Sequence, residues 1–299
     1  MKISVCVVLF HTEFELVQRC LASVRSSTLT SDTELEIIVV DNSTDDKLRA
    51  PFHHLANRWI HSGDNVGFGI ASNTAVKAAS GDLVLFLNPD AEISPNALSE
   101  LASLINATNE KRLLCGWLIS DGQVQVDAMM HWWSSTGRLI RRRLYRKYLA
   151  DAASLPLVQI QKASGGALFG NRSDLIGLGP FDERFFLYGE DADLSVRAQS
   201  KGFKLYGVPS AVVQHIGASS QASHSVLVEQ ARTDAAIRLT SYHLPRLLSI
   251  LCRLDLAVIT AFGLVPGLGR SSGNKAARTA RFSELRRWSI ARDRPVFHP

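Results

Sequence analysis

The stretch ISVCVVLFHTEFELVQRCLASV, residues 3–24, has the pattern of a strand followed directly by a helix. It begins with a near-continuous apolar run, which is typical of a parallel strand covered on both faces. From Phe14 onward, apolar residues recur at helical spacing. Strand and helix keep alternating, with further strand-like runs at residues 35–40, 58–61 and 82–87. This order predicts an α/β fold with an open, mainly parallel sheet flanked by helices, whose ligands bind beyond the carboxyl ends of the strands.

Polar residues follow several of these runs. His11 comes after the first run, Asp41 opens a polar cluster after the second, and Asn88-Pro89-Asp90 follows the fourth. A carboxylate on a turn rigidified by proline can hold a hard divalent cation, which completes its coordination with diphosphate oxygens and water. The sequence therefore suggests a Mg²⁺ or Mn²⁺ site at Asp90, although Asn-Pro-Asp alone is a common turn.

A second informative stretch is GPFDERFFLYGEDADLSVRAQSKGFKLYGVPSAVVQHIGAS, residues 179–219. Glu190, Asp191 and Asp193 fall in the predicted first turn of a helix, where the macrodipole and free backbone N–H groups stabilise carboxylates. Gly202 is expected to end this helix, and two short strands are predicted after it. His215, at the end of the second strand, is a further candidate metal ligand, more suited to Mn²⁺ than to Mg²⁺.

Two other classes of nucleotide-binding protein compete with this interpretation. A dinucleotide-binding domain, as in a nicotinamide-dependent oxidoreductase, needs glycines in the first strand-to-helix turn, where the pyrophosphate approaches the backbone. That turn here reads FHTEFE and has no glycine. The chain also lacks a GxxxxGK[ST] sequence, which disfavours an ATPase. An oxidoreductase therefore remains the weaker alternative.

Seven fragments in this order resemble the family 2 glycosyltransferases of GT-A fold, in particular their rhamnosyltransferase-like branch. The resemblance covers Lys2 to Ser219 and rests on VVLFHTE, VVDNSTDD, DNVGFGIASN, LFLNPDAEI, SGGALFGNRS, GPFDERFFLYGEDADLSVR and VQHIG. It implies a Rossmann-like nucleotide-diphospho-sugar transferase with a mixed, mainly parallel sheet. The donor-binding residues that it implies are Phe10, His11, Asp41, Asn65, Gly67, Asn88 and Asp90.

The resemblance also implies roles around the metal and the acceptor. The usual metal motif Asp-x-Asp is replaced here by Asn88-x-Asp90, which leaves Asp90 and His215 as the expected ligands of Mg²⁺ or Mn²⁺. Asp191 matches the catalytic base of an inverting transfer, and the cation would neutralise charge on the departing diphosphate. Glu190 is its acidic neighbour, on the acceptor side of the site.

Three further residues are assigned to the acceptor. Gly165 and Gly166 either form a bulge in a strand or leave room for a sugar ring. Trp132 is a candidate for stacking on a sugar or lipid, although paired aromatic residues more often complete a core.

The chain divides by composition into two parts. Residues 1–222 form the expected catalytic domain, with a nucleotide-binding part at about 1–110 and an acceptor-binding part at about 111–222. Residues 223–299 are a helical, basic extension, whose apolar run is interrupted by Arg253 and Asp255 and is therefore expected to pack on the domain or lie in a membrane interface. Basic residues also crowd into GRLIRRRLYRKYLA, residues 137–150, and recur between Arg270 and Arg294.

These basic, amphipathic segments suit an anionic membrane surface, while no motif supports a nucleic-acid partner. The formal net charge is +5, and the four cysteines lack metal-ligand spacing, which predicts reduced and mostly buried thiols. Residue 2 leads directly into a strand without a signal peptide, so the expected location is the cytoplasm, with peripheral attachment to the inner face of the membrane.

The resulting functional hypothesis is an inverting, metal-dependent transfer of L-rhamnose from dTDP-L-rhamnose to a lipid-linked or polysaccharide acceptor in bacterial surface-glycan synthesis. The donor, the acceptor and the rhamnose itself rest on the resemblance. A catalytically silent glycan-binding relative is the alternative in another class, and homo-oligomer formation is left open.

Overall fold

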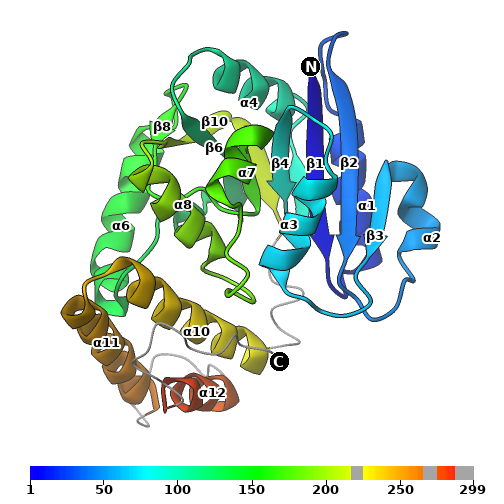
Figure 1. The fold of residues 1–299 in the computed structure, drawn as a ribbon. Coiled ribbons are helices and arrows are strands. Elements are labelled where there is room, and N and C mark those ends of the chain that lie inside the picture. The colour runs from blue at the N-terminus through cyan, green and yellow to red at the C-terminus, as the bar shows by residue number, and fades with distance from the viewer. Residues whose placement is uncertain (217–224, 265–274, 287–299) are drawn as a thin grey trace.

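The computed structural model describes residues 1–216, 225–264 and 275–286, and its strands form one mixed sheet (Figure 1). The strand order is β3-β2-β1-β4-β9-β6-β10-β5, with β7 paired to β6 and β8 paired to β10. The strands with parallel pairing at the N-terminal side are β1 (Lys2–Leu9), β2 (Glu34–Asp41), β3 (Arg58–His61) and β4 (Leu83–Leu87). These four strands lie where the apolar runs predict them, and the mainly parallel sheet of the expected GT-A fold is confirmed for this half.

The second half of the sheet mixes parallel and antiparallel pairs. Its strands are β5 (Ala91–Ile93), β6 (Arg112–Ser120), β7 (Gln123–Val124), β8 (Val158–Gln159), β9 (Ala167–Asn171) and β10 (Lys204–His215). β9 is antiparallel to both of its neighbours, β4 and β6, and joins the two halves.

The prediction of two short strands before His215 is wrong, because β10 is one continuous strand. Its pairing with β6 changes register between Val208 and Val212. Pro209 lies within this irregularity, and since proline has no backbone N–H it cannot contribute a regular ladder hydrogen bond. The break in the local sequence pattern is therefore a bulge inside one strand.

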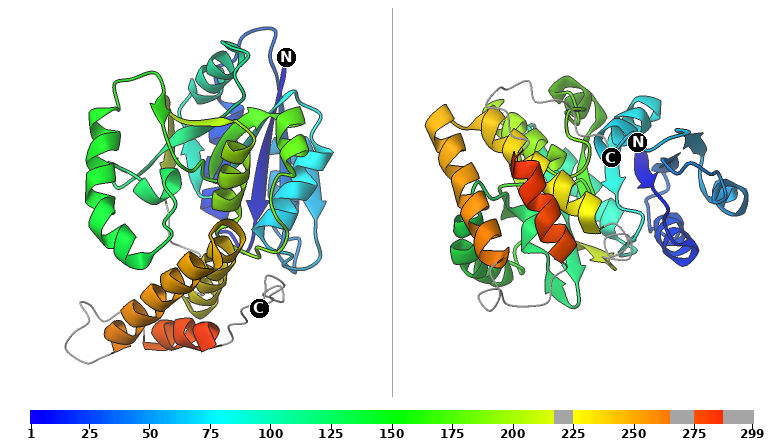
Figure 2. Two further views of the ribbon diagram at one scale, coloured as in Figure 1. Left: turned by 60° about the vertical axis from the view of Figure 1, so that its left-hand side comes forward. Right: turned by 90° about the horizontal axis from the view of Figure 1, so that it is seen from below.

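Helices cover the sheet on both faces (Figures 1 and 2). α1 packs beside β5, α3 lies over β1 and β2, and α7 lies between α3 and α8. The helices before residue 216 are α1 (Phe14–Arg25), α2 (Arg49–Phe52) with the 3₁₀ helix η1 (His53–Leu55), α3 (Phe68–Ala78), α4 (Ala97–Asn106), α5 (Val126–Met129), α6 (Ser135–Asp151), α7 (Arg172–Leu178) and α8 (Glu190–Ser200).

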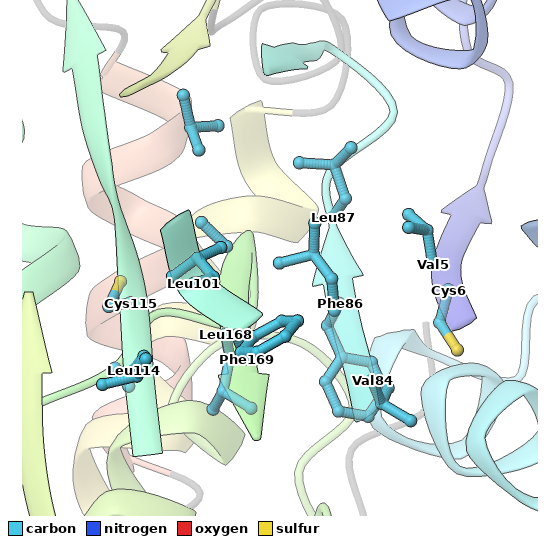
Figure 3. Close-up of a cluster of buried hydrophobic side chains, with 14 of the residues drawn as sticks. Val5, Cys6, Val84, Phe86, Leu87, Leu101, Leu114, Cys115, Leu168 and Phe169 are labelled. Carbon is cyan, nitrogen blue, oxygen red and sulfur yellow. The ribbon is translucent and has the colours of Figure 1, made fainter. Parts of the chain in front are cut away.

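The core is the layer of strand side chains between these helices, part of which is shown in Figure 3. Phe86 of β4 and Phe169 of β9 are almost fully buried on neighbouring strands. Each such side chain contributes about 2 kcal/mol of hydrophobic stabilisation, so the ends of these strands are held rigidly. The four cysteines are not paired with one another, and Cys6, Cys20 and Cys115 are buried, which confirms the prediction of mostly buried thiols.

Three C-terminal helices, α10 (Ser225–His243), α11 (Arg246–Leu264) and α12 (Lys275–Arg286), pack on one another beyond the carboxyl ends of the strands (Figure 1). The predicted helical character of this region is confirmed, and α10 also contacts α8. The proposed boundary at residue 222, and the basic side chains of Arg270 and of residues 287–294, lie outside the described residues. Within the described residues, no helix has both the length and the hydropathy needed to cross a membrane.

Candidate active site

Two cavities meet at the carboxyl edge of the sheet. The strand-end cavity, of about 260 Å³, opens beside the ends of β1 and β4, and the helix-side cavity, of about 470 Å³, lies between the sheet and the helices α10 and α11. Both cavities are lined by the same five residues at their junction: Asn88, Ser164, Tyr188, Asp191 and His215. A carboxylate and an imidazole therefore stand between two adjoining spaces.

Most of the residues predicted from the sequence line the strand-end cavity. Phe10 follows β1, Asp90 follows β4, and Glu190 begins α8, so the cavity collects segments that are far apart in the chain. The predicted residues that line it are Phe10, Asn65, Gly67, Asn88, Asp90, Gly165, Gly166, Glu190, Asp191 and His215.

His11 and Asp41 line neither of the two cavities. His11 is exposed with a φ of 45°, and its backbone N–H donates to Ser43 Oγ over 2.9 Å. Asp41 is fully buried, and its Oδ1 accepts the Ser43 N–H at 2.9 Å, while its Oδ2 has no partner among the described residues. Burial raises the pKa of the Asp41 carboxyl. Their assignment to donor binding stays a prediction.

Asp90 and His215 form a pair because of strand pairing. The turn that holds Asp90 leads into β5, and β5 pairs antiparallel with the end of β10, where His215 is opposite Ala91. The Ile216 N–H also donates to the Asp90 carbonyl over 2.9 Å. As a result, Asp90 Oδ1 lies 3.1 Å from His215 Nε2, and both side chains are mostly buried.

Amide side chains surround the imidazole of His215. Asn88 Nδ2 lies 3.1 Å from His215 Nε2, and Gln125 Nε2 lies 2.9 Å from His215 Nδ1. A neutral imidazole has one donor and one acceptor, so the orientation of the Gln125 amide selects the tautomer. If Gln125 presents its oxygen, Nδ1 keeps the proton and the lone pair of Nε2 faces Asp90.

This donor set fits a hard divalent cation with few protein ligands. Among the described residues, no group of three or more His, Cys, Asp or Glu side chains is arranged to enclose a metal. A Mg²⁺ or Mn²⁺ ion bound mainly through a substrate's phosphate oxygens needs only one or two protein ligands. Asp90 Oδ1 and His215 Nε2 provide two, on the wall of the strand-end cavity.

Asp191 is held by a lysine that the sequence did not single out. Lys162 Nζ lies 3.1 Å from Asp191 Oδ2, with both side chains mostly buried, and the Gly165 N–H donates to the same oxygen over 3.4 Å. These contacts fix the carboxylate at the junction of the cavities.

Glu190 differs from Asp191 although the two are adjacent. Its side chain is buried, and Glu190 Oε2 has no hydrogen-bond partner among the described residues. Burial, followed by repulsion from Asp191, raises the pKa of Glu190 to about 8. Near neutral pH, Glu190 is therefore mainly protonated.

Asp193, the third member of the acidic cluster, holds the fold together. Its Oδ1 lies 2.7 Å from His243 Nε2 at the end of α10, and its Oδ2 accepts from Arg197 Nε over 2.7 Å. Arg197 also donates to the carbonyls of Leu178, Gly179 and Pro180. Asp193 thus joins α8 to a C-terminal helix.

The glycines of the site make room for neighbouring protein groups. A Cβ on Gly166 would lie 2.8 Å from Asn88 Nδ2, and one on Gly165 would lie 2.9 Å from the Phe68 ring. Gly67 has a φ of 87°, and a Cβ there would collide with the Phe186 carbonyl oxygen. Both Gly165 and Gly166 precede β9, outside the strand, so the first of the two alternatives, a bulge within a strand, is wrong.

Tyr188 adds backbone strain at the junction of the cavities. Its φ is 67°, a left-handed conformation that costs a non-glycine residue of this size about 1 kcal/mol or more. The following Gly189, with a φ of 85°, begins the turn into α8. Such strain is often concentrated at functional sites.

Trp132 lies in the wall of the helix-side cavity. Its Nε1 donates to Asp127 Oδ1 over 2.7 Å, and its ring packs against the main core while part of it remains accessible. His131 beside it also lines the cavity, and burial lowers the pKa of His131 to about 4, so that it is neutral at physiological pH.

Lys162, Gln125 and Tyr188 were missed in the sequence, and for Lys162 and Gln125 no local signal distinguishes them. Lys162 is 29 positions from Asp191, and Gln125 is 90 positions from His215. Their contacts depend on how β9, β10 and α8 pack. Tyr188 carried one usable signal, its place directly before a glycine and an acidic helix start.

Comparison with known proteins identifies similar sequences and folds. The family model described as "Glycosyl transferase family 2" matches residues 4–162. An "N-acetylglucosaminyl-diphospho-decaprenol L-rhamnosyltransferase" of Mycobacterium tuberculosis is 29% identical over 232 residues, covering 68% of this chain and 73% of that protein. "Rhamnosyltransferase WbbL" of Escherichia coli is 24% identical over 226 residues, covering 68% of this chain and 80% of that protein.

Solved structures share the fold at low sequence identity. GalNAc-T7, crystallised with UDP, GalNAc and Mn²⁺, superposes with a TM-score of 0.63 at 17% identity, over 95% of this chain and 55% of that chain. S. aureus TarS 1–349 superposes with a TM-score of 0.54 at 16% identity, over 96% of this chain and 90% of that chain. This chain therefore spans about half the length of the first structure and most of the second.

Proposed function

The chain belongs to glycosyl transferase family 2, and from this premise we propose that it transfers L-rhamnose from dTDP-L-rhamnose to a lipid-linked glycan acceptor. The transfer is inverting and depends on Mg²⁺ or Mn²⁺. This proposal replaces the oxidoreductase alternative, which the family assignment leaves without support.

The observation that carries the proposal is the position of Asp191 at the junction of the two cavities. An inverting glycosyl transfer needs a base that reaches the acceptor hydroxyl where it attacks the anomeric carbon, on the face opposite the departing diphosphate. The strand-end cavity, with Asp90 and His215 in its wall, suits the nucleoside diphosphate and its cation. The helix-side cavity, with Trp132 in its wall, suits the acceptor.

The relatives support the choice of sugar and acceptor. Two proteins that match over two thirds of this chain are named rhamnosyltransferases, and one of these names specifies a diphospho-decaprenol acceptor. A diphosphate linked to a polyprenol is an anionic, lipid-anchored acceptor.

Asp90 and His215 would hold the cation, which when bound would neutralise negative charge on the departing diphosphate. With the Gln125 amide turned so that its oxygen accepts from Nδ1, the lone pair of His215 Nε2 would face Asp90 and the cation. Phe10 and Asn65 border the same cavity and are available to the nucleoside. Asp41, buried outside both cavities, is kept as a donor-binding candidate on the sequence alone.

Asp191 performs the proton transfer. As the acceptor oxygen bonds to the anomeric carbon, the bond from that carbon to the diphosphate oxygen breaks, and the hydroxyl proton moves to Asp191. Lys162 and the Gly165 N–H keep the carboxylate oriented before the reaction. Glu190, mainly protonated near neutral pH, limits the negative charge beside the base.

The test separates donor binding from transfer. With Mn²⁺ present, dTDP-L-rhamnose should raise the melting temperature of both the native protein and Asp191→Asn, because a ligand that binds the folded state stabilises it. Asp191→Asn should lose about 10²- to 10⁴-fold of the transfer rate to an acceptor. Chelation of divalent ions with EDTA should abolish transfer by the native protein and reduce the donor-induced shift.

A matched control is Asp151→Asn, since Asp151 is an exposed carboxylate that lines neither cavity. It should leave transfer unchanged. If the native protein binds the donor but transfers nothing, the silent glycan-binding alternative is favoured. If another nucleotide-sugar gives the larger shift, the rhamnose donor is refuted while the enzyme class stands.

A further inference from the structure

Helix α11 exposes apolar side chains and buries polar ones, which is the reverse of the usual arrangement for a helix on a water-exposed surface. Its exposed stripe contains apolar side chains that are each more than half exposed: Leu247, Leu251, Leu254, Val258 and Phe262. They recur at intervals of three and four residues, so they lie along one side of the helix. Among the described side chains of α11, the buried ones are instead polar: Ser249, Arg253 and Thr260.

The buried polar side chains make contacts inside the protein. Arg253 donates to Ser241 Oγ, Thr260 Oγ1 donates to the Leu256 carbonyl over 2.7 Å, and Arg253 also lines the helix-side cavity. With about 100° of rotation per residue, Ser249 and Arg253 face the side opposite the Leu247 stripe. The helix is therefore fixed in this orientation, and its apolar side faces outward.

Helix α6 lies next to α11 and extends the same kind of surface. The Thr136 N–H donates to Asp255 Oδ2 over 3.0 Å, which ties the start of α6 to α11. Leu139, Ile140 and Leu144 of α6 are each more than three fifths exposed. Exposed basic residues lie among and beside these apolar side chains: Arg141, Arg143, Arg146, Lys147 and, at the start of α11, Arg246.

The charge of this surface is strongly one-sided. Helix α6 contains six basic residues and one acidic residue, Asp151. Asp127 pairs with Arg138 and Arg142 on the inner side, at 2.8 and 3.4 Å, which leaves the outer basic residues facing solvent. Exposed leucine, isoleucine and phenylalanine side chains interspersed with arginine and lysine are typical of segments that lie in the interface of an anionic bilayer.

We propose that the α6/α11 surface, defined by the exposed stripe of α11 and the exposed apolar and basic residues of α6, docks on an anionic lipid membrane. A second copy of the chain is a poorer occupant. Two-fold packing would place the same basic patch against itself, and like charges repel. An anionic bilayer accommodates both the apolar side chains and the positive charge.

The docking surface leads to the site of chemistry. A groove of about 700 Å³ between α6 and α11 is lined by four arginines of α6 and by Arg281, and it shares Ser135 and Arg138 with the helix-side cavity. A membrane bound to α6 and α11 would therefore present anionic headgroups at the entrance that leads to Asp191. This inference deepens the proposed function and rests on it, because the lipid-linked acceptor is part of that proposal.

The test is vesicle flotation of the full chain without donor or acceptor, so that it does not depend on catalysis. The native chain should bind vesicles of phosphatidylcholine mixed with phosphatidylglycerol, should bind pure phosphatidylcholine weakly, and should be released by high salt. The double variant Leu254→Asp/Val258→Asp should lower the affinity for mixed vesicles by about tenfold or more, because two apolar anchors are lost and two negative charges are added.

Ile176→Asp is the matched control, because Ile176 is a comparably exposed apolar residue on α7, outside α6 and α11. It should bind like the native chain. Equal binding by the native chain and the double variant, or none by either, overturns the proposal. A native dimer in sedimentation velocity that dissociates in the double variant, with no vesicle binding, assigns the surface to a second copy instead. Donor-induced stabilisation, measured separately, shows whether the proposed function itself has failed.

Discussion

Replacing Glu190 with glutamine should make the protein more stable, and increasingly so as the pH rises. Glu190 is buried beside Asp191, and burial raises its pKa from 4.5 to about 8. The folded state therefore holds this proton more tightly than the unfolded state does. The stability associated with the raised pKa is fully present below about pH 4.5 and is lost as the pH rises toward about 8. Glutamine resembles the protonated acid and does not titrate.

The size of the effect follows from the two pKa values. One pKa unit corresponds to about 1.4 kcal/mol. By about pH 5.5 the unfolded state has already lost most of this proton, while the folded state keeps it until near the top of the range, at about pH 8.5. The stabilisation by Glu190→Gln should therefore grow by about 3 kcal/mol across this interval. That is a large fraction of the 5–15 kcal/mol stability that is typical of a folded domain.

The assay is urea unfolding of the native protein and Glu190→Gln at several pH values, with the free energy of unfolding compared at each. Glu34→Gln serves as a control, because Glu34 is an exposed glutamate at the start of β2. A difference between the native protein and Glu190→Gln that stays constant with pH would refute the reasoning. So would a glutamine variant that is less stable at the alkaline end.

Two further predictions concern the packing of the site. Gly166→Ala should weaken donor binding by about tenfold, because the new Cβ would lie 2.8 Å from Asn88 Nδ2 and displace a cavity-lining amide, at a cost of about 1 kcal/mol or more. The donor-dependent shift in melting temperature measures this effect, and an unchanged donor affinity would contradict it. Asp193→Asn should lower the free energy of unfolding by about 3 kcal/mol, because a buried carboxylate with Arg197 and His243 at 2.7 Å loses its charge. Urea unfolding tests this, and a change below about 1 kcal/mol would show that the contacts of Arg197 with carbonyl groups suffice.

Much of the fold was predictable because its strands are local patterns. A buried parallel strand is a continuous apolar run, so β1, β2 and β4 are recognisable without any partner. The position of β9 between β4 and β6 could not be predicted, since the sequence of residues 167–171 does not indicate which strands they pair with. Local pattern also divided β10 in two, because a bulge and a loop share the same turn residues.

The candidate site likewise contains features that the local sequence predicts and features that depend on tertiary packing. Asp90, Asp191 and His215 were predicted to converge from their places at strand and helix ends, and the structure brings all three to the wall of one cavity. Their catalytic and metal-binding roles remain predictions. Their place in the first turn of α8 does not distinguish Asp191 from Asp193, and only the family resemblance singled out Asp191 as the base.

The sequence by itself determined the alternation of elements and the chemical types that stand at their ends, because backbone conformation and hydrophobic periodicity act over a few residues. Only the tertiary structure decided which acid meets Lys162 at the cavity junction and which meets His243. The same packing decided which acid keeps a buried carboxyl oxygen without a hydrogen-bond partner among the described residues. It also decided that α11 buries its polar side and exposes its apolar side. Burial and charge pairing depend on groups brought together from distant parts of the chain, and these set the chemistry of each side chain.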